Sequence, residues 1–389
     1  MKRSTERILT THTGSLPRPA DLLPLIQAME KGTGAPAAFG IRVRSAVAEI
    51  VRAQVEAGVD IVNDGEMGKP SYATYVKDRL EGFEQGTQPE PFTGPADMAD
   101  FPEYRERYNL RRAAAALVRP KCVGEVSHKE SGAVEKEIDD LRAAVSQSPA
   151  AEAFLSAASP GVISIFLRNE YYKTHEAYIA ALAEAMKPEY EAIHRAGLML
   201  QIDCPDLAMG RHIQFPDLSV AEFRKKIVLH VEMLNVALAN IPADRVRIHL
   251  CWGNYEGPHH RDVALRDIID IVFRIRASGI SYEAANPRHE HEWAVFKHEW
   301  AVFKDVKLPD SKVLIPGVID STNNFIEHPE LIAQRISNVA NLVGRENVIA
   351  STDCGFATSA TFSAVDSKIT WAKFQSIAEG ARLASRQLW

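Results

Sequence analysis

The chain has few cysteines and no long hydrophobic run. Its four cysteines in 389 residues are too few and too widely spaced for a disulfide framework, which favours a reducing compartment. No apolar stretch is long enough to span a bilayer. The N-terminal sequence also lacks the apolar segment of a secretory signal. We therefore expect a cytoplasmic protein with no membrane partner.

An excess of charge of one sign is also lacking. Lysine and arginine total 45 against 51 aspartates and glutamates, so the formal net charge is only −6. This balance gives no reason to expect nucleic acid as a partner. The hydrophobic content of 46% is that of an ordinary globular protein with a large core.

Strand-like and helix-like segments alternate along most of the chain, which predicts an α/β fold with a parallel sheet. No glycine-rich phosphate loop follows the first strand, which disfavours a doubly wound sheet. We therefore predict a TIM-type (β/α)8 barrel. Helices are expected at 20–31, 40–58, 132–146, 174–196, 219–240, 262–277, 328–343 and 366–388. Strands are expected at the start of 8–19 and at 60–66, 121–126, 161–167, 198–203, 246–252, 280–286, 312–320 and 348–355.

Nine strands exceed the eight positions of the barrel, so one of them, most readily the strand near Cys122, must be wrong or lie outside it. Residues 72–120 are rich in charge, proline and glycine. We interpret them as an irregular or helical insertion, or lid, over the barrel mouth within a single domain, 1–389. The sequence His-Glu-Trp-Ala-Val-Phe-Lys occurs at 291–297 and again at 298–304, which we interpret as a local duplication.

Three of the predicted strands end in side chains that can bind zinc. His249 and Cys251 lie two residues apart, so on one strand both project from the same face. Glu283 and Cys354 lie near the ends of two later strands. Because a barrel collects the carboxyl ends of its strands at one rim, these four residues can form a zinc site. The alternative is that both cysteines are small buried hydrophobic residues without a metal.

With these segments in view, the chain resembles the cobalamin-independent methionine synthase family, specifically its catalytic C-terminal barrel. The resemblance runs from Thr11–Pro19 to Cys354-Gly355. His249-x-Cys251, Glu283 and Cys354 coincide with that family's zinc ligands in type, order and spacing. The resemblance implies zinc as the cofactor, and a homocysteine-like thiol and an alkyl donor as small-molecule substrates. It does not decide between a monomer and a homo-oligomer.

Further motifs resemble the family's amino-acid site. The segment Thr13-Gly-Ser-Leu-Pro-Arg18 is similar to its Gly-Ser-Phe-Pro segment, which implies that Gly14 and Ser15 hold the substrate. Asp64-Gly-Glu66 and Gln201-Ile-Asp203 resemble motifs whose carboxylates receive the amino group of homocysteine. The resemblance thus assigns Glu66 and Asp203 to that amino group. The alternative is that these two acids cap helices or turns.

Two departures from the family leave the second substrate open. The family's histidine that protonates the leaving folate corresponds here to Thr322, and threonine is a poor proton donor at neutral pH. Cys204 stands where the family has an acid after Asp203.

The sequence Tyr255-Glu-Gly-Pro-His-His-Arg-Asp262 offers cationic groups for an anionic substrate, or is simply a solvated loop. The candidate residues for binding the second substrate are His12, His259, His260, Arg261, Asp320 and Thr322.

These observations predict a zinc-dependent thiol alkyltransferase. The leading version is transfer of a methyl group from a folate-type donor to homocysteine. The alternative is opening of an epoxide by coenzyme M, because epoxyalkane:coenzyme M transferases are similar to the same barrel and zinc motif. Uroporphyrinogen decarboxylase-like barrels need no zinc. The complete set of four candidate ligands therefore disfavours that class. A protein with a purely structural zinc site is also disfavoured, because such sites use ligands close together in the sequence.

Overall fold

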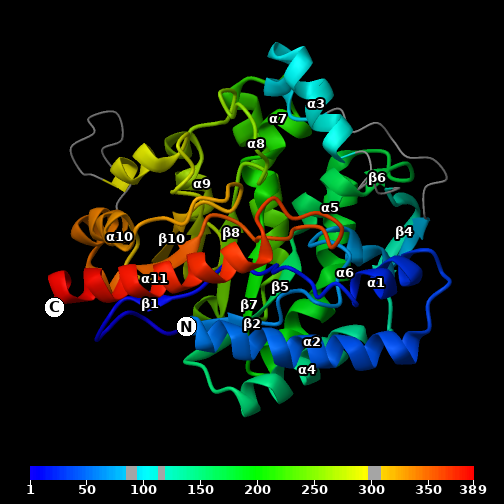
Figure 1. The fold of residues 1–389 in the computed structure, drawn as a ribbon. Helices are drawn as coiled ribbons and strands as arrows, with labels where there is room; N and C mark the ends of the chain where they lie inside the picture. The colour runs from blue at the N-terminus through cyan, green and yellow to red at the C-terminus, as the bar shows by residue number, and fades with distance from the viewer. Residues whose placement is uncertain (85–93, 113–118, 297–307) are drawn as a thin grey trace.

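Eight parallel strands form the centre of the computed structural model, which describes residues 1–84, 94–112, 119–296 and 308–389. The strand order is β1-β11-β10-β9-β8-β7-β5-β2. At the closing edge, Asp60 N donates to Thr10 O at 3.1 Å and Thr11 Oγ1 donates to Ile61 O at 3.0 Å. The predicted TIM-type barrel is confirmed (Figure 1). The strands are β1 (Leu9–Thr10), β2 (Ile61–Asn63), β5 (Glu152–Ala158), β7 (Met199–Asp203), β8 (Val246–Leu250), β9 (Gly279–Tyr282), β10 (Val313–Ile319) and β11 (Ile349–Thr352).

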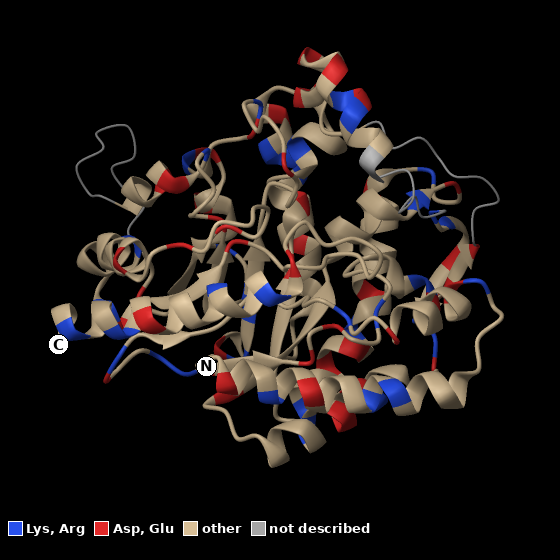
Figure 2. Ribbon diagram, viewed as in Figure 1, with Lys and Arg blue, Asp and Glu red and all other residues tan. Residues whose placement is uncertain are grey.

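Amphipathic helices pack around the barrel, with α2 beside α4 and α10 beside α11 (Figure 1). Local sequence sets where they start: the Thr174 side chain caps α6, and Ser219 with Glu222 forms a capping box at α8. Acidic and basic residues are intermixed along α2 and α11 (Figure 2). The helices are α1 (Leu23–Glu30), α2 (Pro36–Glu56), α4 (Ala133–Gln147), α6 (His175–Arg195), α8 (Val220–Ala237), α10 (Pro329–Val343) and α11 (Ser367–Leu388). None of the helices in the described ranges has the length and apolarity needed to cross a membrane.

The barrel interior is filled by side chains from several strands. The apolar side chains among them form one cluster. The Arg247 guanidinium lies against Phe154 of this cluster, 4.3 Å from the centre of the ring. It donates hydrogen bonds to Thr11 Oγ1 at 3.0 Å and His12 O at 2.9 Å, so the buried cation ties β8 to the N-terminal segment. The interior is therefore closed below the carboxyl ends of the strands. The cluster contains Ile61, Phe154, Met199, Val313, Ile315 and Ile349.

One strand prediction was wrong. Residues 161–167 are not a strand, because they lie in helix α5 (Pro160–Phe166). The Ser159 side chain accepts a hydrogen bond from Val162 N at 3.0 Å and Pro160 occupies the first turn, which are strong helix-start signals. The barrel strand is β5, just before this helix. The strand near Cys122 is β4 (Lys121–His128), and it lies outside the barrel, as expected for the ninth strand, between β3 (Leu80–Glu84) and β6 (Arg168–Asn169).

The helix expected at 262–277 is much shorter in the structure. That stretch contains the 3-10 turn η6 (Leu265–Asp267) and the four-residue helix α9 (Ile269–Val272). The first copy of the tandem repeat lies mostly in η7 (Glu290–Phe296), whereas the second copy, 298–304, falls outside the described residues. The other short elements are α7 (Gly210–Ile213), η4 (Pro205–Leu207), η5 (Ala243–Arg245) and η8 (Arg345–Asn347).

The segment 72–120 combines several short elements. It contains η1 (Thr74–Asp78), β3, η2 (Ala96–Asp100) and α3 (Pro102–Arg112). Residues of η2 contact the loop after β8: Asp97 Oδ2 accepts from Tyr255 OH at 2.5 Å and from His259 N at 2.7 Å. The assignment of 72–120 as an insertion or lid within a single domain, 1–389, stays a prediction.

Candidate metal centre and substrate pocket

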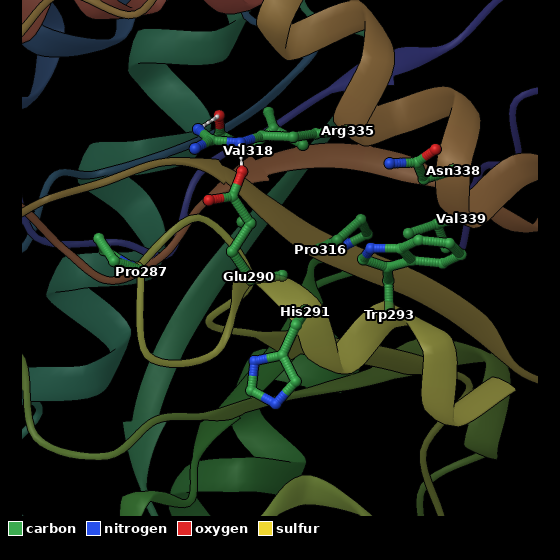
Figure 3. Close-up of a pocket in the computed structure, with 11 residues that line it drawn as sticks. Pro287, Glu290, His291, Trp293, Pro316, Val318, Arg335, Asn338 and Val339 are labelled. Carbon is green, nitrogen blue, oxygen red and sulfur yellow. Dashed lines mark hydrogen bonds and ion pairs between the residues drawn. The ribbon is translucent and has the colours of Figure 1, made fainter. Parts of the chain in front are cut away.

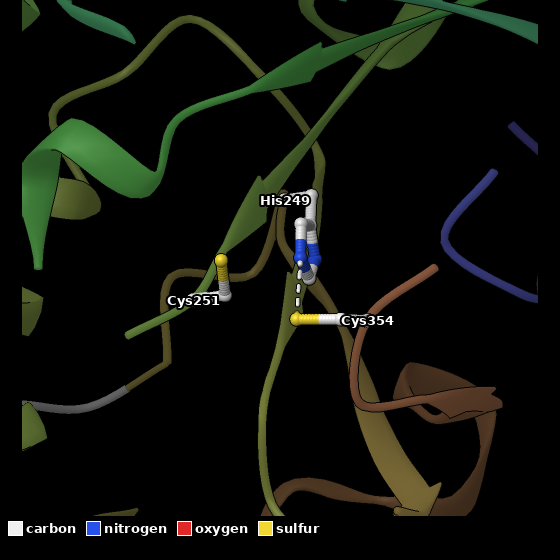
Figure 4. A group of neighbouring side chains, drawn as sticks. All are labelled: His249, Cys251 and Cys354. Atoms are coloured by element: carbon white, nitrogen blue, oxygen red, sulfur yellow. Dashed lines mark hydrogen bonds between the residues drawn. The ribbon is translucent and has the colours of Figure 1, made fainter. Parts of the chain in front are cut away.

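The four predicted metal ligands come together at the carboxyl ends of β8, β9 and β11. Ligand atoms of His249, Cys251 and Cys354 all lie within 4.8 Å of one another (Figure 4). Cys354 Sγ is 3.5 Å from His249 Nε2 and 3.1 Å from Glu283 Oε1. Glu283 thus joins the group through Cys354. The strand register explains this meeting, because His249 pairs with Ser281, two residues before Glu283.

Burial shifts the pKa values of the histidine and the cysteines in opposite directions. It lowers the pKa of His249 to about 3, helped by the charge of Arg247, so the imidazole is neutral and keeps a lone pair. Burial also raises the pKa of the Cys354 thiol well above its usual value, and the thiol of Cys251 next to it adds to this shift. One imidazole, two sulfurs and one carboxylate are a donor set that suits tetrahedral zinc.

Neighbouring groups hold the candidate ligands in place. His249 Nδ1 lies 3.3 Å from Ser281 Oγ, and Trp252 N donates to Glu283 Oε2 at 3.3 Å. Ser321 Oγ accepts from Cys354 N at 3.2 Å. Such outer contacts fix the orientation of a metal ligand.

The loop that carries Glu283 is anchored by Asp353, a residue that the sequence interpretation did not single out. The carboxylate of Asp353 accepts from the backbone N–H groups of Ala284, Ala285 and Asn286, at 2.8, 2.8 and 2.7 Å. Gly317 permits this approach, because a Cβ there would overlap Asp353 Oδ1. The only sequence signal was the position of Asp353 directly before Cys354.

A cavity beside the candidate ligands holds two predicted substrate carboxylates. Glu66 is buried with a φ of 57°, and its Oε1 accepts from Ser156 Oγ at 3.0 Å. Its Oε2 has no hydrogen-bond partner and lies 3.9 Å from Arg18 Nη2. Asp203 is also buried, and burial followed by the charge of Glu66 raises its pKa well above the usual value. The cavity is lined by Thr13, Ser15, Glu66, Tyr72, Asp203, Pro205, His249, Cys251, Gly253, Asn254, Cys354, Gly355 and Thr358.

Ser15 lines the same cavity, and Gly14 lies next to Glu66. A Cβ on Gly14 would stand 2.9 Å from Glu66 Oε1, and the φ of Gly14 is 147°, so this position requires glycine. Ser15 packs against Gly355, where a Cβ would overlap Ser15 Oγ. The structure therefore brings Gly14, Ser15, Glu66 and Asp203 together with the candidate metal ligands.

The residues predicted to bind a second substrate are more scattered. His12 lies in the core between the rings of Phe154 and Phe374, and burial lowers its pKa to about 3. Thr322 donates through N and Oγ1 to Asp320 Oδ1 at 2.6 and 2.7 Å. None of His12, Asp320 and Thr322 lines the cavity described above.

The three polar residues after β8 differ among themselves. His259 is buried and points to Asp262, with its Nδ1 2.7 Å from Asp262 Oδ2. His260 and Arg261 are exposed, and both pair with Asp100 of η2. Their part in binding a second substrate stays a prediction.

Tyr72 and Asn254 line the cavity, but the sequence analysis did not name them as site residues. Tyr72 is the first residue of the segment 72–120, and nothing in its local pattern distinguishes it. Asn254 has a φ of 41° and donates to Gly355 O at 2.9 Å, which joins the loops after β8 and β11. The sequence signal for Asn254 was its position after a glycine at a strand end.

A separate pocket of about 360 Å³ lies between η7 and α10 and contains none of the candidate ligands (Figure 3). Its charged groups satisfy each other: Arg335 Nε donates to Glu290 Oε1 at 2.8 Å and Arg335 Nη1 donates to Val318 O at 3.0 Å. Figure 3 shows Trp293 and His291 on the η7 side of this pocket.

Comparisons with known proteins show similarity along almost the whole chain. The methionine synthase from Thermococcus kodakarensis is 26% identical, and the alignment covers 97% of this chain and 94% of the relative. The methionine synthase from Saccharolobus solfataricus is 24% identical, and the alignment covers 97% of this chain and 95% of the relative. Two solved structures share the fold at 19% identity. Each superposition covers 98% of this chain and 99% of the chain in the solved structure. They are B12-independent methionine synthase from Shewanella sp. W3-18-1 in complex with selenomethionine (TM-score 0.70) and a putative vitamin-B12 independent methionine synthase from Listeria monocytogenes (TM-score 0.62).

The family description "Cobalamin-independent synthase, Catalytic domain" matches residues 115–373, which include all four candidate ligands. This range is more than half of the chain. The protein therefore belongs to the family of cobalamin-independent synthase catalytic domains.

Proposed function

We propose that this chain is a zinc-dependent methyltransferase that transfers a methyl group from a folate-type donor to the sulfur of homocysteine. One observation supports this most directly: the His249, Cys251 and Cys354 cluster opens into the same cavity as Glu66 and Asp203. A thiol-binding group and an ammonium-binding group therefore lie within one small pocket. The names of the similar methionine synthases agree with that arrangement.

The amino end of the substrate would bind to the two acids. Glu66 Oε2 has no hydrogen-bond partner in the described structure, and Gln201 Oε1 next to Asp203 has none either. Gln201 Nε2 donates to Asp203 Oδ1 at 2.8 Å and so fixes that carboxylate. Unsatisfied buried oxygens are costly, and a substrate ammonium would satisfy them with charge-assisted bonds.

The sulfur end of the substrate would lie at His249, Cys251, Glu283 and Cys354. Zinc held by these residues would lower the pKa of a coordinated thiol, so that the sulfur is a nucleophilic thiolate at neutral pH. The protein contributes a buried donor set and a small cavity that is lined in part by Tyr72 and Thr358.

The charge of the cavity favours homocysteine over coenzyme M as the thiol. Glu66 and Asp203 suit an ammonium group and would repel a sulfonate. His260 and Arg261, which the sequence offered for an anionic group, do not line the cavity, and both are paired with Asp100.

The metal assignment is tested by replacing Cys251 or Cys354 with serine. We expect each variant to lose zinc, measured by elemental analysis, together with methionine formation, measured by mass spectrometry with homocysteine and methyltetrahydrofolate. Cys122→Ser is the matched control, because Cys122 is equally buried but lies in the small sheet. Full zinc and turnover in both test variants would contradict the assignment. Wild-type protein that holds zinc but forms no methionine would contradict the proposed pair of substrates.

A further inference from the structure

A second cluster of side chains of the kind that bind metals lies in the loops after β8 and β9. Asp262 is its centre: Oδ2 lies 2.7 Å from His259 Nδ1 and 2.9 Å from His289 Nε2. These three ligand atoms lie within 4.8 Å of one another. The side chains are almost completely buried, with exposed fractions of 4% for His259, 2% for His289 and 1% for Asp262.

The outer nitrogen of each imidazole also faces a hydrogen-bond acceptor. His259 Nε2 lies 3.0 Å from the carbonyl oxygen of Tyr255, and His289 Nδ1 lies 2.8 Å from Glu292 Oε2. A neutral imidazole carries only one N–H. A neutral ring can therefore serve only one of its two acceptors. A cation between the inner nitrogen and Asp262 would leave the N–H free for the outer acceptor.

We propose that His259, His289 and Asp262 bind a divalent transition-metal ion of the zinc type. The outer contacts are those expected around a metal, since a ligating histidine donates its other N–H to a backbone carbonyl or a carboxylate. Tyr255 O and Glu292 Oε2 take these two roles. Glu292 is itself held by Leu265 N, which donates to its Oε1 at 2.7 Å.

His212 provides an independent observation for a ligand at this place. It is 2% exposed, and its Nδ1 lies 2.8 Å from Asp262 Oδ1 without hydrogen-bond geometry. Its Nε2 also has no hydrogen-bond partner in the described structure. A buried imidazole aimed at the same carboxylate is suited to act as a fourth ligand.

The proposed ion would connect segments that are distant in the sequence. His259 and Asp262 lie in the loop after β8, His289 precedes η7 and His212 lies in α7. The indole of Trp252, next to Cys251, stacks on His289 with ring centres 3.9 Å apart. The proposed ion would therefore support the candidate zinc site through Trp252. Its own ligand atoms would be nitrogen and oxygen only, without sulfur. This proposal does not depend on the proposed function.

Cobalt titration separates the two sites, because only a thiolate site gives a sulfur-to-cobalt charge-transfer band in the near ultraviolet. We expect metal-free wild type to bind two equivalents of Co²⁺, only one of which contributes that band. The double variant His259→Gln/His289→Gln should keep the band and lose one equivalent. Cys251→Ser/Cys354→Ser should lose the band and keep one equivalent. His291→Gln is the control, since His291 is an exposed neighbour of Glu292.

Glu292→Gln provides a milder test that keeps the shape of the side chain. Loss of an outer carboxylate should weaken binding of the second Co²⁺ about 10- to 100-fold without changing the charge-transfer band. A wild type that saturates at one equivalent, with the same stoichiometry in the His259→Gln/His289→Gln variant, would overturn the proposal.

Discussion

Glu66 has a combination of properties that is unfavourable for folding. Its backbone lies in the left-handed region at a φ of 57°, its side chain is buried, and one carboxylate oxygen lacks a hydrogen-bond partner. Strain and unsatisfied polar atoms of this kind cluster at functional sites. The position of Glu66 in the cavity agrees with a role in binding substrate.

Glu66→Gln should weaken homocysteine binding more than it affects the fold. The amide removes one negative charge from the ammonium site, and loss of a charged hydrogen bond of about 1.5–3 kcal/mol predicts a KM for homocysteine that is higher by roughly 10- to 100-fold. Steady-state kinetics would measure this, with Glu379→Gln on the surface of α11 as the control. An unchanged KM would remove Glu66 from the substrate site.

Asp203 should make stability depend on pH in the metal-free protein. Burial and the charge of Glu66 raise its folded pKa above the unfolded value of about 3.9. The folded state then holds this proton more tightly, so the contribution to stability is present at low pH and is lost as the pH rises toward the folded pKa. Asp203→Asn should therefore raise the melting temperature at pH 8, and the gain should shrink toward pH 4. A lower melting temperature at pH 8 would contradict this.

At the level of elements, the loop after β11 must pack directly on the N-terminal segment. Gly355 lies against Ser15, and Phe356 N donates to Ser15 O at 2.9 Å. Gly355→Ala would place a Cβ 3.1 Å from Ser15 N and over its Oγ. We expect a loss of about 1–3 kcal/mol in the free energy of unfolding, together with weaker metal binding.

Urea unfolding and metal titration measure both effects of Gly355→Ala. Gly210→Ala is the matched control, because its Cβ would meet Phe223 at an ordinary 3.6 Å inside a helix. Equal stability of the two variants would show that the loop after β11 shifts without cost.

The elements predicted best from the sequence are those defined by the alternation of apolar and polar side chains at neighbouring positions. The strand that carries His249 was predicted correctly, because alternation along β8 depends only on neighbouring residues, and Cys251 directly follows the last residue of this strand. Residues 161–167 were predicted wrongly because a short apolar run suits a buried strand and a buried helix equally well. The Ser159-Pro160 start signal could have decided between them, whereas the alanine-rich β5 has weak strand propensity.

At the scale of the whole molecule, the barrel explains why residues far apart in the sequence meet. Parallel strands place all their carboxyl ends at one rim, so Glu66, Asp203, His249 and Cys354 could be expected near each other. Contacts made by the segment 72–120 could not be predicted. The meeting of Asp97 with Tyr255 and His259 depends on how that segment folds back, which no periodic pattern encodes.

Asp97 should therefore matter more for stability than its neighbour Asp100. Asp97 is fully buried and accepts from Tyr255 OH and His259 N, so Asp97→Ala should cost about 3 kcal/mol and increase hydrogen exchange in α3. Asp100 is partly exposed and pairs with His260 and Arg261, so Asp100→Ala should cost at most about 1 kcal/mol. Similar losses in both variants would contradict this difference.

The pairing of the first barrel strand with the last sets an order of events during protein synthesis. β1 is hydrogen-bonded along one edge to β11, with Leu9 opposite Ile349. On the ribosome, β1 must wait for this partner until residue 349 has been translated. Cys354 emerges with the same late segment, two residues after β11. A nascent chain interrupted before this point would have neither a closed barrel nor a complete set of candidate ligands, so closure of the barrel and assembly of the ligand cluster depend on the same late segment.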